Sequence, residues 1–163
     1  MNALTLPCRK PELFKYSPHQ SSMLLLDQAI DYNLDDSCIT TSLVITETSE
    51  FLDQKQMKMP VWVSFEYMAQ SIALLSGIAH VQTGGVPKIG FIMGVRDCSM
   101  EQAWFELADE VTIQVLEEFR EGDVAVFEGR ALVGDKLYCS AVLSVVENNK
   151  ELMDQWTDKF SIA

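Results

Sequence analysis

PVWVSFEYMAQSIALLSGIAHV, residues 60–81, is the stretch that decides the fold of this chain. Pro60 suits a first helical position, the interior is rich in Ala, Leu, Met and Gln, and Gly84 and Pro87 follow the stretch. These features predict one long helix over residues 60–81. Because that helix is mostly apolar, we expect the rest of the chain to pack around it.

Two polar side chains, Glu66 and Gln70, interrupt this apolar helix one turn apart. At about 100° per residue they share a stripe with the small residues Ala73 and Gly77 and with His80. A carboxyl group on an apolar surface is unfavourable unless it is paired or used chemically. We therefore expect Glu66 to be a site residue, the alternative being a buried structural carboxyl. We expect the stripe to face a cleft or a partner subunit.

The hydropathy of the stretch would also allow a membrane span. The cost of inserting Glu66, Gln70 and His80, and the lack of a flanking positive cluster, argue against one. The first ten residues lack a signal region, so we expect a cytoplasmic protein with no membrane span. The length of 163 residues and the hydrophobic content of 48% suit a single domain over residues 1–163.

Composition excludes several classes of function. The net charge of −12 and the absence of a basic run argue against a nucleic-acid partner. The four cysteines form no CxxC or Cys/His cluster, and the chain has only two histidines. We therefore expect reduced thiols and no metal site.

Alternating apolar and polar residues around the helix are typical of β-strands. One strand is expected before the helix, over residues 39–46. Further strands are expected after it, with turns at Gly122 and Gly134, over residues 90–100, 111–119, 124–133 and 137–146. Gly129, inside one of these strands, predicts a bulge or a close approach.

These elements predict an α+β fold in which a curved antiparallel sheet wraps around one long central helix. The core is expected over roughly residues 12–146. In the polar tail, residues 147–163, Leu152, Trp156 and Phe160 recur every four residues, which predicts a short docking helix or a frayed end. The free edge of the sheet and the small-residue stripe both favour dimerisation.

Two motifs resemble the bacterial 3-hydroxyacyl-carrier-protein dehydratases. Residues 17–27, SPHQSSMLLLD, resemble the PHRxPxLLxD opening of that family, and residues 65–70, FEYMAQ, resemble its EAMAQ helix motif. With VWV before the glutamate, the helix is most similar to the dehydratase-like proteins of aryl polyene gene clusters. The resemblance extends in the same order over roughly residues 12–146. It implies the hotdog fold, usually a dimer with active sites at the subunit interface.

One departure from the family affects the catalytic pair. The fatty-acid dehydratases carry their catalytic histidine in a GHFPG motif fourteen residues before the helix glutamate, and that position here is Leu52. His19 is the only histidine in a region matching the family. We therefore hypothesise that His19 replaces the missing histidine. The alternative is a capping or packing role, because the PHR histidine of the relatives is not the catalytic one.

The implied reaction, dehydration of a 3-hydroxyacyl thioester, needs a base, an acid and donors for the developing enolate oxygen. Glu66 and His19 are the candidates for acid and base. The backbone amides of Val61 and Trp62, at the helix start, are expected to bind the thioester oxygen. Gln70 is expected to orient the Glu66 carboxyl, or else to satisfy a backbone group at a dimer seam.

The resemblance implies an enzyme that acts on chains, including aryl-capped ones, bound to an acyl carrier protein. Two alternatives stay open, namely a hotdog thioesterase that uses Glu66 and a non-catalytic subunit of a dehydratase heterodimer. A homodimer and a heterodimer are equally compatible with the sequence. No cofactor is implied.

Asp27 and His80 are expected to be structural. Candidate contacts for an acidic carrier are Lys55, Lys58, Lys88, Arg96 and Arg120.

Overall fold

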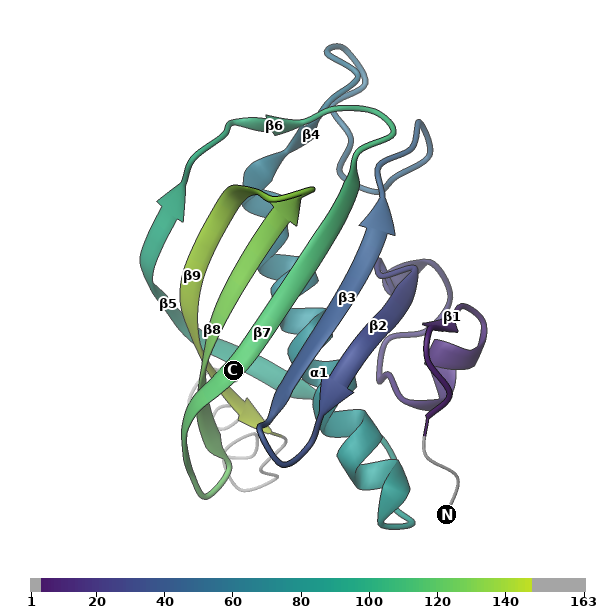
Figure 1. Ribbon diagram of the computed structural model, residues 1–163, viewed down its shortest axis with the longest axis vertical. Helices are drawn as coiled ribbons and strands as arrows, with labels where there is room; N and C mark the ends of the chain where they lie inside the picture. The colour runs from purple at the N-terminus through teal and green to yellow at the C-terminus, as the bar shows by residue number, and fades with distance from the viewer. Residues whose placement is uncertain (1–3, 148–163) are drawn as a thin grey trace, which may run out of the picture.

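The computed structural model describes residues 4–147, and one helix lies at its centre (Figure 1). This helix, α1 (Ser64–Gln82), packs against β3, β7, β8 and β9 of a curved, seven-stranded antiparallel sheet. The strand order across the sheet is β1-β2-β3-β7-β8-β9-β5. The predicted α+β architecture, a curved sheet around one long helix, is confirmed.

The strands lie close to the predicted ranges. They are β1 (Cys8–Arg9), β2 (Gln28–Asn33), β3 (Cys38–Val44), β5 (Gly90–Met100), β7 (Glu110–Glu121), β8 (Val124–Val133) and β9 (Lys136–Glu147). A separate pair is formed by β4 (Met59–Pro60) and β6 (Trp104–Phe105), and 3-10 turns lie at η1 (Glu12–Lys15), η2 (Ser21–Met23) and η3 (Val61–Val63). All five predicted strands are confirmed within two residues at each end.

Side chains on the inner face of β8 form part of the core against α1. Ala125, Phe127 and Ala131 are buried, as the period of two requires. Gly129 lies between them, and a Cβ atom there would be 2.7 Å from the Sδ atom of Met68. The close approach predicted for Gly129 is therefore present, and it lets the helix lie near the sheet.

The start of the helix differs from the prediction. Pro60 has extended backbone angles and belongs to β4, and the α-helix begins only at Ser64, after the turn η3. The amide of Val61 donates a hydrogen bond to the carbonyl of Ala103 at 3.0 Å. The pairing of β4 with β6 thus holds residue 60 in extended backbone, so the prediction that it opens the helix is wrong.

The small-residue stripe of α1 is covered by the chain's own backbone at Gly77. A Cβ atom at this position would lie 1.8 Å from the carbonyl oxygen of Tyr16, far inside contact distance. A glycine is therefore required for the N-terminal segment to cross the helix. At Gly77 the stripe meets this segment and is not open to a partner subunit.

Strand β5 forms one edge of the sheet, because it pairs with β9 alone. Its apolar side chains are unusually exposed, by 40% to 61%, at Phe91, Ile92, Met93, Val95 and Met100. The predicted free edge is present. The helix predicted for the tail lies outside the described residues. Within residues 4–147, no helix combines the length and hydropathy needed to cross a membrane.

Candidate active site

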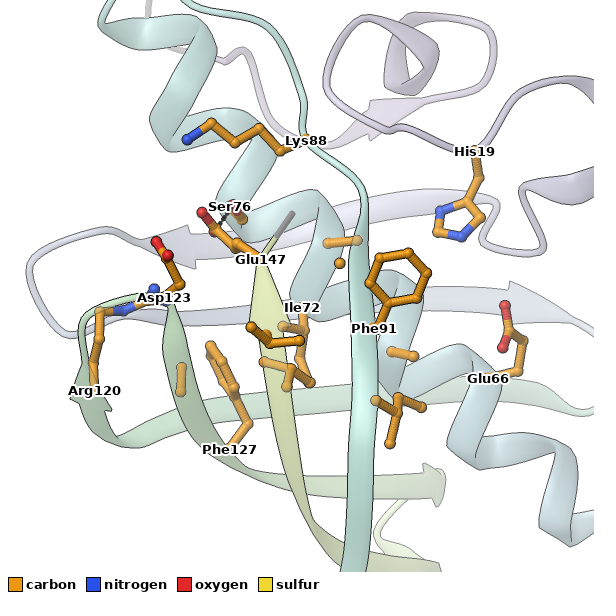
Figure 2. A pocket seen from close by; sticks show the side chains of 17 residues that line it. His19, Glu66, Ile72, Ser76, Lys88, Phe91, Arg120, Asp123, Phe127 and Glu147 are labelled. Carbon is orange, nitrogen blue, oxygen red and sulfur yellow. Dashed lines mark hydrogen bonds between the residues drawn. The ribbon is translucent and has the colours of Figure 1, made fainter. Parts of the chain in front are cut away.

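A cavity of about 260 Å³ follows α1 beneath the edge of the sheet (Figure 2). His19 and Glu66 lie at one end, and their imidazole and carboxyl groups point toward one another. The middle of the cavity is apolar and includes Ile72, Phe91 and Phe127. The cavity therefore combines two groups able to exchange protons with a lining suited to an acyl chain.

The carboxyl group of Glu66 is held by Gln70, one helical turn later. Glu66 is half-buried, and its Oε1 atom accepts a hydrogen bond from Gln70 Nε2 at 2.8 Å. This spacing of four residues places both side chains on the same face of α1. The hydrogen bond predicted between these two residues is therefore present, and it fixes one carboxyl oxygen of a residue that lines the cavity.

Gln70 also ties the helix to the loop that carries His19. Its side chain, with the residue 1% exposed, donates from Nε2 to the carbonyl of Met23 at 2.8 Å. Its Oε1 atom accepts from the amide of Leu25 at 2.7 Å. The predicted role in satisfying backbone groups is found as well, but these groups belong to the same chain and not to a dimer seam. One amide thus connects the Glu66 carboxyl to the residues that follow His19.

His19 is positioned by hydrogen bonds within its own loop. Its backbone amide donates to Ser17 Oγ at 3.0 Å, and the side chain of Gln20 donates to the carbonyls of Phe14 and Ser17. Within residues 4–147, His19 Nδ1 is buried and has no hydrogen-bond partner. A buried nitrogen without a partner is costly unless a ligand or water satisfies it.

The two residues predicted to supply oxyanion donors do not line this cavity. The amide of Val61 is already bonded to Ala103, so the prediction of a free donor at Val61 is wrong. The Trp62 side chain is exposed and packs edge-on against Phe51, with ring centroids 6.5 Å apart. Leu52, at the position of the family histidine, is buried.

Asp27, from the opening motif, has the structural role predicted for it. Its Oδ2 atom accepts the amide of Val44 at 2.8 Å, and Oδ1 lies 3.7 Å from Lys10 Nζ. The carboxylate therefore joins the start of β2 to the end of β3. His80 is likewise held near the helix end, where Nδ1 lies 2.8 Å from the carbonyl oxygen of Ser76.

The other end of the cavity is charged, which the sequence did not predict. Ser76, Lys88, Arg120, Asp123 and Glu147 line it. The Ser76 hydroxyl donates to Glu147. Lys88 and Arg120 were predicted only as surface contacts for a carrier. No sequence pattern pointed to Ser76, Asp123 or Glu147 as lining residues.

The guanidinium of Arg120 is held by Glu117 through hydrogen bonds of 2.7 Å and 3.0 Å. These bonds are the largest cause of a raised pKa for Arg120, and the negative charges of Glu117, Glu147 and Asp123 raise this pKa further against the opposing effect of burial. Arg120 is therefore a fixed cation near the charged end. Within residues 4–147, no group of three or more His, Cys, Asp or Glu side chains is placed to hold a metal.

Comparison with known proteins finds dehydratases among the similar sequences and structures. A 3-hydroxyacyl-[acyl-carrier-protein] dehydratase FabZ from Legionella pneumophila is 25% identical over 134 residues, which cover 81% of this chain and 89% of that protein. A protein of the same name from Coxiella burnetii is 28% identical over 142 residues, covering 83% and 96% of the two chains.

A solved structure, the dehydratase heterocomplex ApeI:P from Xenorhabdus doucetiae, superposes with a TM-score of 0.81. The match covers 94% of this chain and 98% of that one at 24% identity, so it supports the hotdog fold. The model of the ApeP-like family, described as ApeP dehydratase, matches residues 11–157. That range contains the His19 loop, the Glu66 helix and the whole sheet from β2 onward. The chain therefore belongs to the ApeP-like dehydratase family.

Proposed function

We propose that this protein dehydrates carrier-bound 3-hydroxyacyl thioesters to enoyl thioesters, with His19 and Glu66 as its proton-transfer pair. The observation that carries this proposal is that the two side chains line the same end of an apolar cavity and point toward one another. The reaction needs one base and one acid on either side of the C2–C3 bond of the substrate. An apolar cavity beyond them accommodates the remainder of the chain.

In this mechanism His19 is the base. Its imidazole, which lines the cavity beside Glu66, takes the proton from C2 of the substrate on a neutral ring nitrogen. The electron pair of that C–H bond forms the C2=C3 double bond, and the C3–O bond breaks. Glu66 gives its proton to the departing hydroxyl, so the products are an enoyl thioester and water. Proton transfer from His19 to Glu66, directly or through water, then restores both groups.

In the acid role Glu66 keeps Oε1 as the acceptor of the Gln70 amide, which leaves Oε2 to carry the proton that is transferred. Gln70 is a positioning residue in this proposal, because it also binds Met23 and Leu25 of the loop that follows His19. The amide of Trp62, the predicted donor for the thioester oxygen, lies one turn before Glu66 but does not line this cavity, so the proposal assigns no donor to that oxygen.

We further propose that the substrate is presented by an acyl carrier protein and that aryl-capped chains are among those accepted. A second hotdog subunit, identical or related, would pair with the free edge of β5, where exposed apolar side chains flank the cavity residue Phe91. The heterocomplex of the matched structure supports a related subunit as partner. A cytoplasmic location fits the four unpaired cysteines.

The decisive experiment incubates the purified protein with a 3-hydroxyacyl carrier thioester and analyses the products by mass spectrometry. A dehydratase yields the enoyl thioester, 18 mass units lighter, with its thioester intact. Release of free acid would instead identify a thioesterase. Unchanged substrate that is converted only after a related hotdog subunit is added would identify a non-catalytic subunit. Either of these two results would overturn the proposal.

A further inference from the structure

The lysine and arginine side chains differ in whether a carboxylate neutralises them. Within residues 4–147, five of them form ion pairs, namely Lys10, Lys58, Arg96, Arg120 and Arg130. Three of these, Lys58, Arg96 and Arg120, were among the contacts predicted for an acidic carrier. In the same part of the chain, the cations with no carboxylate within 4.0 Å are Arg9, Lys15, Lys55, Lys88 and Lys136. These unpaired cations decide where an acidic partner is attracted.

Two of the unpaired cations lie where two segments of the chain meet on α1. A Cβ atom at Gly77 would be 1.8 Å from the carbonyl oxygen of Tyr16 and 3.4 Å from the Cβ atom of Pro87. Both segments therefore lie against the helix at the same residue. Lys15 precedes Tyr16 and Lys88 follows Pro87. The fold thus brings these two lysines, which are far apart in sequence, to one side of the molecule.

The third cation of this group is Arg9. It ends β1, which packs against η1, the 3-10 turn that ends at Lys15. Lys88 lines the cavity, and His19, four residues after Lys15, lies at the reactive end of that cavity (Figure 2). All three cations are exposed, and Glu12 is the only acid in residues 8–16. Three positive charges beside the cavity are therefore opposed by one negative charge.

The net charge of −12 repels an acidic partner from most of this chain. Salt screens charges beyond about 8 Å at physiological ionic strength, so a partner in contact responds mainly to the charges nearest to it. Acyl carrier proteins are acidic. The other two unpaired cations are each close to an acid in sequence, since Lys55 follows Asp53 and Lys136 follows Asp135. Only the group beside the cavity combines an excess of unpaired cations with access to the reactive end.

We propose that Arg9, Lys15 and Lys88 form a basic surface that docks the acyl carrier protein. Their charges bind acidic side chains of the carrier, and its prosthetic arm enters the cavity at the His19 end. The basic surface deepens the proposed function and rests on it in one respect, namely that a carrier presents the substrate. Because this surface and the proton-transfer pair use different residues, docking and dehydration are tested separately.

The test measures binding without turnover. An acyl carrier protein loaded with an amide-linked 3-hydroxyacyl analogue is titrated calorimetrically against the full-length protein. The double variant Arg9→Glu with Lys15→Glu should bind it about tenfold more weakly, because two attractions become repulsions. The matched control is Lys55→Glu with Lys136→Glu, which changes the net charge equally and should stay within about twofold of the unmodified protein. Equal affinities of the two double variants would overturn the proposal.

Salt provides a second measurement that needs no variant. Raising the ionic strength from about 0.05 M to about 0.3 M should weaken carrier binding about tenfold, because screening removes the attraction. An uncharged pantetheine-linked analogue should bind equally at both. Carrier binding that is independent of salt would overturn the proposal, and so would a phosphopantetheine-linked analogue with the full salt dependence, since the surface would then bind the phosphate. A protein that docks the carrier here yet forms no enoyl product would refute only the proposed function.

Discussion

Gln70 Nε2 lies 2.8 Å from Glu66 Oε1 and also 2.8 Å from the carbonyl oxygen of Met23. One buried amide therefore joins the carboxyl of the central helix to the loop that carries His19. Such a residue acts on the reaction through the positions of other groups, without touching the substrate. The relative placement of His19 and Glu66 depends on this link, because no other hydrogen bond among the described residues joins that loop to the Glu66 side chain.

The substitution Gln70→Glu is expected to separate positioning from packing. The new side chain has the same shape and still accepts from Leu25, but it cannot donate to Met23 or to Glu66. We expect kcat to fall about 10- to 100-fold with little change in KM, because misplaced catalytic groups slow the chemical step. Loss of the buried donor should lower the free energy of unfolding by about 1–3 kcal/mol. A lowered stability with an unchanged kcat would leave Gln70 with a structural role only.

The variants His19→Ala and Glu66→Gln test the proton-transfer pair. Each removes one titrating group from the cavity end, so kcat should fall about 10²- to 10⁴-fold in a carrier-thioester assay. Glu118→Gln, an exposed change outside the cavity, is the matched control. Full dehydration activity in His19→Ala would show that the histidine is a packing residue.

The elements that the sequence predicted correctly are those with a local signal. β5 and β8 were bounded by turns and by a period of two, and their observed ends agree with the prediction. β2 was missed because only one of its six residues, Ala29, is buried, so it shows no alternation and is held by its pairing with β3. The two-residue strands β4 and β6 are too short for any periodicity.

The candidate site shows the same division. Glu66 and Gln70 share a helix, so their hydrogen bond followed from a spacing of four residues. The bonds from Gln70 to residues 23 and 25 cross more than forty positions of sequence, and no periodicity encodes them. Ser76 and Glu147 are 71 residues apart and meet only because β9 ends beside the helix.

Three glycine-to-alanine substitutions should lower the free energy of unfolding by different amounts, the loss being largest where the space around the glycine is smallest. Gly77→Ala places a methyl group 1.8 Å from the Tyr16 carbonyl, which is backbone, so we expect a loss of about 3 kcal/mol or more. Gly129→Ala meets the flexible end of Met68 at 2.7 Å and should cost about 1 kcal/mol. Gly94→Ala meets nothing within 4 Å and should stay within about 0.5 kcal/mol. Urea unfolding of the three proteins gives the order, and equal stabilities would contradict the observed crossing at Gly77.

The thiols of neighbouring strands report on both burial and assembly. Burial is the main cause that raises the pKa of Cys139 to about 11, whereas Cys98, on the edge strand β5, is exposed. At pH 8 iodoacetamide should therefore label Cys98 at least 100-fold faster than Cys139, because the thiolate is the reacting form. A thiol whose pKa is raised by folding contributes stability below its unfolded value, near pH 9, and that stability should be lost as the pH approaches 11.

If a second subunit pairs with β5, the labelling of Cys98 should slow as the protein concentration increases and the edge becomes covered. Met93→Glu places a charge on this exposed edge and should weaken the pairing, since charges on edge strands oppose association. In this variant the labelling rate should become independent of concentration, and light scattering should give the mass of a monomer. Cys98→Ser identifies the labelled peptide. A labelling rate that does not depend on concentration in the unmodified protein, together with the mass of a dimer, would place the interface on another surface.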